Sequence, residues 1–168
     1  IGIYSYASAL NYFLKFQIKV TSDTIGTFVM FSSLLAFLGT SVILVRLITK
    51  YDEKLIHRIM IFIGIILMSI ILYRLNLGTV SYVLMAVYTM TYEIVRSLGN
   101  SIIAHRYKNE QGKILGVASA VGFLGNAMGS LLSGHLLNAN SRLPFIVNIS
   151  IMSIVLVFLL VQRTTEKK

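Results

Sequence analysis

Two residues of opposite charge, Glu93 and Arg96, lie three positions apart in a segment that is otherwise strongly apolar. On a helix this spacing lets the two side chains meet. One stripe of that helix carries five polar residues: Thr89, Glu93, Arg96, Ser97 and Asn100. A polar stripe on an apolar helix faces protein or a water-filled cavity rather than lipid. We therefore predict that Glu93 takes up a proton or recognises a cation with Arg96 as its partner; the alternative is a static ion pair between helices.

A second polar stripe lies near the start of the chain. At helical spacing it contains Tyr4, Ser8, Asn11 and Lys15. These side chains suit the wall of a cavity that hydrogen-bonds a substrate. Small polar side chains also pack helices together inside membranes, and the sequence favours neither interpretation.

Closely spaced glycines mark a segment nearer the C-terminus. The residues on this small face are Gly112, Gly116, Gly125, Asn126, Gly129 and Gly134. Glycines four positions apart let two membrane helices approach closely. The segment has no preceding strand and no Gly-Lys-Ser/Thr ending, which argues against a phosphate-binding loop. We expect this helix to pack against a moving neighbour.

Long apolar segments must position these side chains. Residues 25–45, 114–137 and 143–161 contain no Asp, Glu, Lys or Arg. About 20 apolar residues are enough for a helix to cross a bilayer, and the segments lack the alternation of barrel strands. We predict an all-α, polytopic transmembrane six-helix bundle that forms one domain. Its helices are expected at approximately 1–18, 22–48, 56–75, 79–104, 113–137 and 143–162.

Composition supports a membrane protein and argues against an enzyme. Hydrophobic residues make up 56% of the chain and charged residues 12%, whereas soluble domains are about 25% charged. The net charge of +9 is explained by membrane topology, so we expect no nucleic-acid partner. The chain has no cysteine, its three histidines lack metal-ligand spacing, and no catalytic motif is present. We expect neither catalysis nor a cofactor.

The basic residues predict an orientation in the membrane. Lys and Arg concentrate in residues 46–58, 106–113 and 163–168. Cytoplasmic loops carry an excess of Lys and Arg. We therefore predict a multi-pass protein of the plasma membrane with these segments, and hence the C-terminus, in the cytoplasm.

Glu93 is followed by two glycine patterns in a fixed order. Residues 110–116 read Glu-Gln-Gly-Lys-Ile-Leu-Gly, and residues 125–134 read Gly-Asn-Ala-Met-Gly-Ser-Leu-Leu-Ser-Gly. The order resembles the C-terminal half, helices 7 to 12, of a major facilitator superfamily transporter. In that family an acidic residue lies in helix 10 of many drug:proton antiporters, and related glycine motifs open and line helix 11. Ser130 and Ser133 replace a proline and a glycine of that pattern.

The resemblance implies a function and a missing partner. Such transporters have two six-helix halves with the substrate and ion sites between them. The N-terminal six-helix half is then absent from this chain and is its expected partner, together with the lipid bilayer and a small-molecule substrate. The resemblance implies a secondary active transporter with proton-coupled efflux of drug-like or other small organic molecules. Uptake of a sugar, peptide or organic acid, or a non-transporting membrane scaffold or partner subunit, are the alternatives.

Overall fold

The structure is a computed structural model that describes residues 21–73 and 79–165. This part of the chain is helical. Its elements are α2 (Ser22–Leu38), the π-helical turn η2 (Gly39–Leu44), α3 (Val45–Ile48), α4 (Glu53–Tyr73), α5 (Thr79–Arg106), the 3-10 turn η3 (Lys108–Glu110), α6 (Gln111–Ala139) and α7 (Leu143–Thr165). The predicted helix at 1–18 lies outside the described residues, as do Tyr4, Ser8, Asn11 and Lys15 of its polar stripe.

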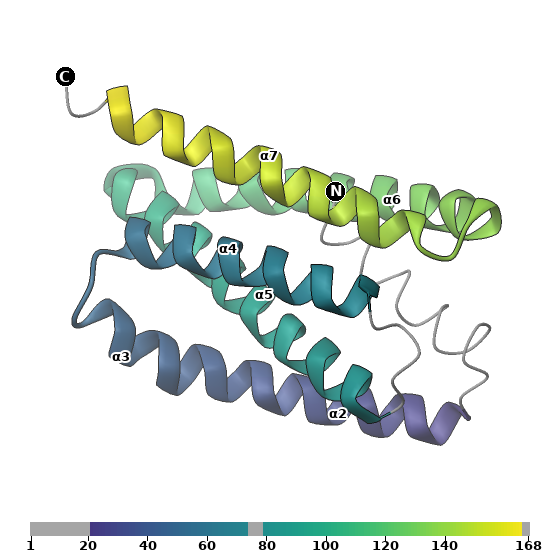
Figure 1. Cartoon of the computed structure of the whole chain (residues 1–168). Coiled ribbons are helices and arrows are strands. Elements are labelled where there is room, and N and C mark those ends of the chain that lie inside the picture. The colour runs from purple at the N-terminus through teal and green to yellow at the C-terminus, as the bar shows by residue number, and fades with distance from the viewer. Residues whose placement is uncertain (1–20, 74–78, 166–168) are drawn as a thin grey trace.

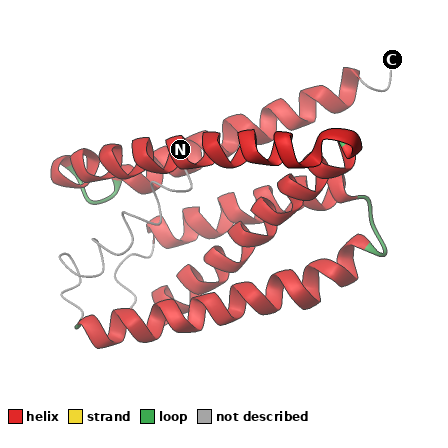
Figure 2. Cartoon of the chain, turned by 180° about the vertical axis from the view of Figure 1, so that it is seen from behind, coloured by secondary structure: helices red, strands yellow, loops and turns green. Residues whose placement is uncertain are grey.

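The helices form a bundle in which α5 is central (Figure 1). Helix α5 packs most extensively against α4 and α2, and it also contacts η2 and α6. Helix α7 packs against α4 and α6. Seen from behind, the same rods run alongside one another, with short loops at their ends (Figure 2). Segments far apart in the sequence, such as α2 and α5, therefore share an interface.

Four of the helices are long and apolar enough to cross a membrane. They are Ser22–Ile48, which joins α2, η2 and α3, Glu53–Tyr73, Lys108–Ala139 and Leu143–Val161. Helix α5 is not among them, because its apolar residues are interrupted by its polar stripe. Helix α5 lies in the centre of the bundle, where neighbouring helices cover most of its apolar side chains. Met85, Ala86, Tyr88, Ile94 and Leu98 are each no more than 1% exposed.

The largest buried cluster joins four helices through α5. Phe28 of α2, Met68 of α4, Tyr88 of α5 and Phe145 of α7 belong to it. Beside it the Tyr88 hydroxyl donates to Oδ1 of Asn148 on α7 over 2.9 Å. Tyr88 is 1% exposed and Asn148 is 0% exposed. The hydrogen bond therefore gives a buried polar atom of each side chain a partner.

A π-helical turn interrupts the helix that the sequence predicts as regular across 22–48. The turn begins at Gly39, where a Cβ atom would lie 2.5 Å from Cγ of Met90 on α5. A side chain at this position would therefore require the Met90 side chain or the backbone to shift, and glycine lets Met90 of α5 pack directly against the backbone of η2. At the same junction the Thr40 hydroxyl donates to the carbonyls of Ala36 and Phe37, at 2.9 and 3.1 Å. Turns of this kind are frequent at functional sites.

Helix ends differ from the predicted bounds by a few residues. Helix α4 begins at Glu53 rather than 56, because the Asp52 carbonyl already accepts from the Ile56 amide. Helix α7 begins at Leu143, the predicted start, with buried Pro144 in its first turn. Proline is tolerated there because its missing amide would have no partner within the helix.

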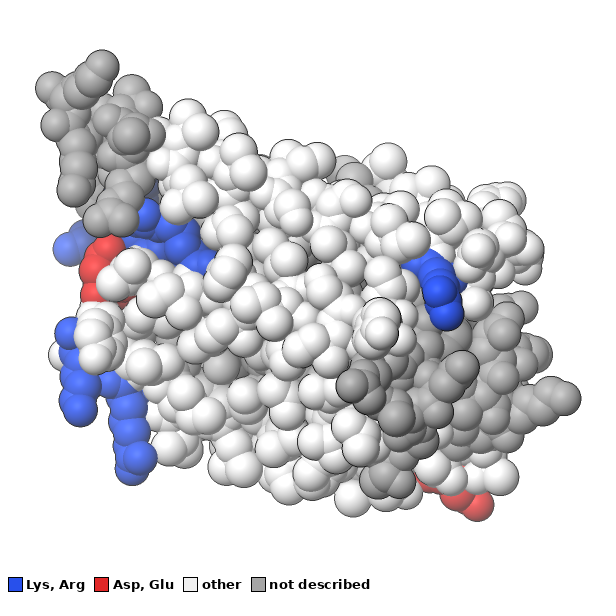
Figure 3. Space-filling model, viewed as in Figure 1, with Lys and Arg blue, Asp and Glu red and all other residues white. Residues whose placement is uncertain are grey.

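Positive charge gathers at one end of the bundle (Figure 3). The α3–α4 and α5–α6 connections and the end of α7 lie at this end (Figure 1). The connections and the adjoining helix turns contain Arg46, Lys50, Lys54, Arg58, Arg106, Lys108 and Lys113. The α6–α7 connection at the opposite end contains Arg142. The bundle is therefore electrically polar along its axis.

Candidate functional site

An open cavity of about 290 Å³ lies between α2 and α5. Its volume is close to the lower end, about 300 Å³, of small-molecule pockets. Among the described residues its wall consists of Ser33, Ala36, Phe37, Thr40, Thr89 and Glu93. Three hydroxyls, one carboxylate and one aromatic ring thus line the same space.

Helix geometry explains which side chains reach this cavity. Thr89 and Glu93 are four residues apart on α5, so they lie one turn apart on the same face. The opposite wall has helical spacing too, because its residues Ser33, Phe37 and Thr40 are four and three positions apart. Beside the cavity, Gly39 packs closely against Met90, which lies three residues before Glu93 on α5.

Glu93 forms an ion pair at the edge of the cavity. Its Oε1 lies 3.4 Å from Nη1 of Arg96, which donates to it. The Glu93 side chain is 33% exposed and that of Arg96 is 52% exposed. Such a pair contributes only about 0–1 kcal/mol in water, so a proton or another cation can compete with Arg96 for the carboxylate. Asn100, one turn further along the stripe, is exposed.

The sequence identified only one wall of the cavity. Glu93 and Thr89 stand out in the sequence because charged and polar groups are rare in apolar helices. Ser33, Phe37 and Thr40 gave no comparable signal, since single hydroxyls are common in membrane helices. Their spacing places them on one helical face. That face can be recognised as a cavity wall only once α2 is known to pack against α5.

The glycines of α6 occupy different environments. Gly125 and Gly129 are buried in the bundle, as is Ser133. A Cβ atom at Gly112, Gly116 or Gly134 would meet nothing within 4 Å. Close packing by these three glycines remains a prediction.

Asn126 joins this face through a long side-chain contact. The Ser130 hydroxyl donates to Oδ1 of Asn126 over 3.5 Å. Both residues lie on α6, so this contact is local and links no second helix. A packing role for Asn126 is likewise a prediction.

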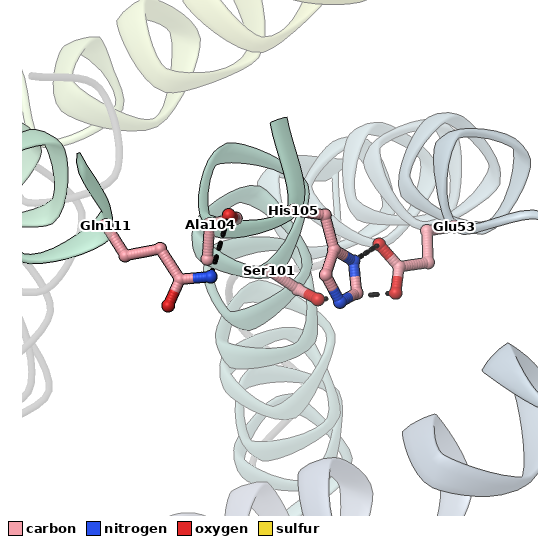
Figure 4. Close-up of polar contacts among 5 residues, drawn as sticks. All are labelled: Glu53, Ser101, Ala104, His105 and Gln111. Carbon is pink, nitrogen blue, oxygen red and sulfur yellow. Dashed lines mark hydrogen bonds and ion pairs between the residues drawn. The ribbon is translucent and has the colours of Figure 1, made fainter. Parts of the chain in front are cut away.

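A second polar cluster lies at the basic end of the bundle (Figure 4). Glu53, in the first turn of α4, accepts from the Ser101 hydroxyl over 3.3 Å. Its other oxygen lies 3.4 Å from Nδ1 of His105. Beyond them the Gln111 side chain donates to the Ala104 carbonyl over 3.2 Å. These contacts connect the end of α5 to the start of both α4 and α6, which suits a structural brace.

Residues 21–73 and 79–165 contain no group of three or more His, Cys, Asp or Glu side chains placed to hold a metal ion. The chemistry offered by the described site is therefore that of one carboxylate, its guanidinium partner and three hydroxyls.

A bundle of apolar helices with a polar cavity between two of them is typical of a multi-pass membrane transport protein. The family model for the Major Facilitator Superfamily matches residues 1–168. The chain belongs to this family, and it is therefore part of a membrane transporter and not an enzyme. This is also the family that the order of Glu93 and the glycine motifs resembles.

One similar protein carries a more specific name than the family does. The chain is 24% identical over 145 residues to Multidrug resistance protein 2 of Bacillus subtilis (strain 168). The match covers 86% of this chain and 36% of that protein, so the chain spans little more than a third of its relative. No solved structure matches the chain.

Proposed function

We propose that the chain is the C-terminal half of a secondary active transporter that exports drug-like or other small organic molecules in exchange for protons. The position of Glu93 in the wall of the α2–α5 cavity carries this proposal. A carboxylate beside a cavity can hold either a proton or a cationic group, but not both at once. The distant similarity to a multidrug resistance protein supports the choice of export and of substrate class.

Arg96 is a third cation that can pair with Glu93, besides the proton and the substrate. When Glu93 is ionised, the guanidinium 3.4 Å away neutralises it. Protonation of Glu93 removes that attraction, which is stronger in the low dielectric of a membrane protein than in water. Because both side chains lie on α5, proton uptake and release at Glu93 would change the charge that this helix presents to the cavity and would release or recapture the Arg96 side chain.

The test replaces the titrating group without changing its shape. In the complete protein, reconstituted into proteoliposomes under an imposed pH gradient, Glu93→Gln should abolish gradient-driven transport of a panel of small aromatic amines. Asp23→Asn is the matched control, because Asp23 is an exposed acid in the first turn of α2. Uphill transport that is undiminished in Glu93→Gln would remove Glu93 from the mechanism.

The assignment to the C-terminal half rests on the order of the motifs. An acid in one helix followed by a glycine-patterned helix fits helices 10 and 11 of the family. The complete coding sequence tests this directly: six further apolar segments upstream are expected. A start codon immediately before Ile1 would favour a scaffold or partner subunit instead.

A further inference from the structure

Two of the three hydroxyls that line the α2–α5 cavity can act only as hydrogen-bond acceptors toward a ligand, while the third, Ser33, can donate or accept. A threonine hydroxyl has a single proton to donate. The Thr89 hydroxyl donates its proton to the Met85 carbonyl over 2.9 Å. The Thr40 hydroxyl directs its proton to the backbone carbonyls at the start of the π-helical turn. Each Oγ1 atom therefore presents only lone pairs to a ligand.

The carboxylate of Glu93 completes this set of acceptors. An ionised carboxylate accepts hydrogen bonds and donates none. Its present partner, Arg96, approaches through a guanidinium N–H. The chain's own contact thus shows the kind of group that satisfies this side of the cavity, namely a cation with hydrogen-bond donors.

We infer that the cavity binds cations bearing N–H groups, meaning primary or secondary ammonium ions, in preference to quaternary ammonium ions. This inference rests on the proposed function, because it treats the cavity as the substrate site. An ammonium group can satisfy Glu93 and the two threonine oxygens with its N–H donors. A quaternary ion carries the same charge but leaves these acceptors without partners when it displaces water.

The expected preference follows from the hydrogen bonds at stake. Loss of one hydrogen bond to a charged group lowers affinity by about tenfold or more. The exposed ring of Phe37 lines the same cavity and can contact the apolar part of either ligand. It therefore contributes to affinity without distinguishing the two classes of cation.

Two probes with the same ring and charge isolate the N–H groups. Equilibrium binding of benzylammonium and of benzyltrimethylammonium to the purified complete protein should differ by at least about tenfold in favour of benzylammonium. Equal affinities, tighter binding of the trimethyl ion, or no binding of either probe would overturn the inference.

Isosteric variants separate hydrogen bonding from the size of the cation. Thr40→Val and Thr89→Val keep the volume of the wall but remove an acceptor, so each should reduce the preference for benzylammonium by severalfold. Thr40→Ser and Thr89→Ser should retain it. Thr49→Val is the matched control. The Thr49 hydroxyl makes the same kind of hydrogen bond, 2.8 Å long, to the Arg46 carbonyl, but Thr49 does not line the cavity. A full preference in both valine variants would overturn the inference.

Binding and coupling can fail separately. If Glu93→Gln retains uphill transport while the N–H preference depends on Thr40 and Thr89, the recognition stands and the proton mechanism falls. If Glu93→Gln abolishes uphill transport but the wild-type protein binds both probes equally, the mechanism stands and this inference falls.

Discussion

Substituting Gly39 by Ala tests whether the close approach of η2 to α5 shapes the bundle. The added Cβ would lie 2.5 Å from Cγ of Met90, 3.0 Å from its Sδ and 3.4 Å from Cδ1 of Ile94. Carbon atoms are in favourable contact at about 3.5–4.0 Å, so Met90 or the backbone must move by about 1 Å. Overpacking of this kind costs about 1–3 kcal/mol.

Helix propensity acts in the opposite direction and must be subtracted. Alanine is favoured over glycine inside a helix by about 0.5–1 kcal/mol. Gly26→Ala supplies this correction, because a Cβ at Gly26 of α2 meets nothing within 4 Å. We expect Gly39→Ala to be less stable than Gly26→Ala by about 1–3 kcal/mol.

The measurement is the equilibrium unfolding of the complete protein in mixed lipid–detergent micelles. A double-mutant cycle with Met90→Ala identifies the clash, because removing Cγ and Sδ of Met90 should recover most of the penalty at Gly39. If Gly39→Ala and Gly26→Ala are equally stable, or if Met90→Ala gives no recovery, the steric explanation of this contact is wrong.

Three further outcomes are expected. Tyr88→Phe should lower the free energy of unfolding by about 0.6–2 kcal/mol, because it removes the 2.9 Å bond to buried Asn148; an unchanged value would mean that the bond contributes nothing net. Glu53→Gln should lower it by no more than about 1 kcal/mol, because its partners are partly exposed; a larger loss would reveal a deeper role than a brace. Single cysteines replacing Lys50 and Arg142 should react with a membrane-impermeant maleimide from opposite sides, with Lys50→Cys labelled from the cytoplasm; same-side labelling would contradict the orientation.

The sequence was sufficient to predict four helices that are long and apolar enough to cross a membrane, but not how the helices meet. The hydrocarbon thickness sets the length of an apolar segment, and this constraint acts on each segment alone. The segment predicted at 22–48 is observed as Ser22–Ile48 with a π-helical turn inside it. The segment alone gives no sign of that turn, which begins where Gly39 meets Met90, a residue far away in the sequence.

The candidate site was predictable to the same extent. Glu93 and Thr89 stood out because polar residues are costly in an apolar helix. Thr40 did not, since its contribution depends on the facing of α2 and α5. The glycine pattern of α6 indicated a small-residue face, but it could not distinguish buried Gly125 and Gly129 from Gly112 and Gly116, which face open space.

The π-helical turn at Gly39–Leu44 accommodates one surplus residue without forming a loop. At the end of this turn, Leu44 packs with Ile94 and Leu98 of α5. Without the surplus residue, a regular α-helix would point this side chain about 100° away from α5. Shortening this stretch by one amino acid should therefore turn Thr40 and Leu44 relative to each other. Family members with a regular helix here should carry one residue fewer between their counterparts of Ala36 and Leu47.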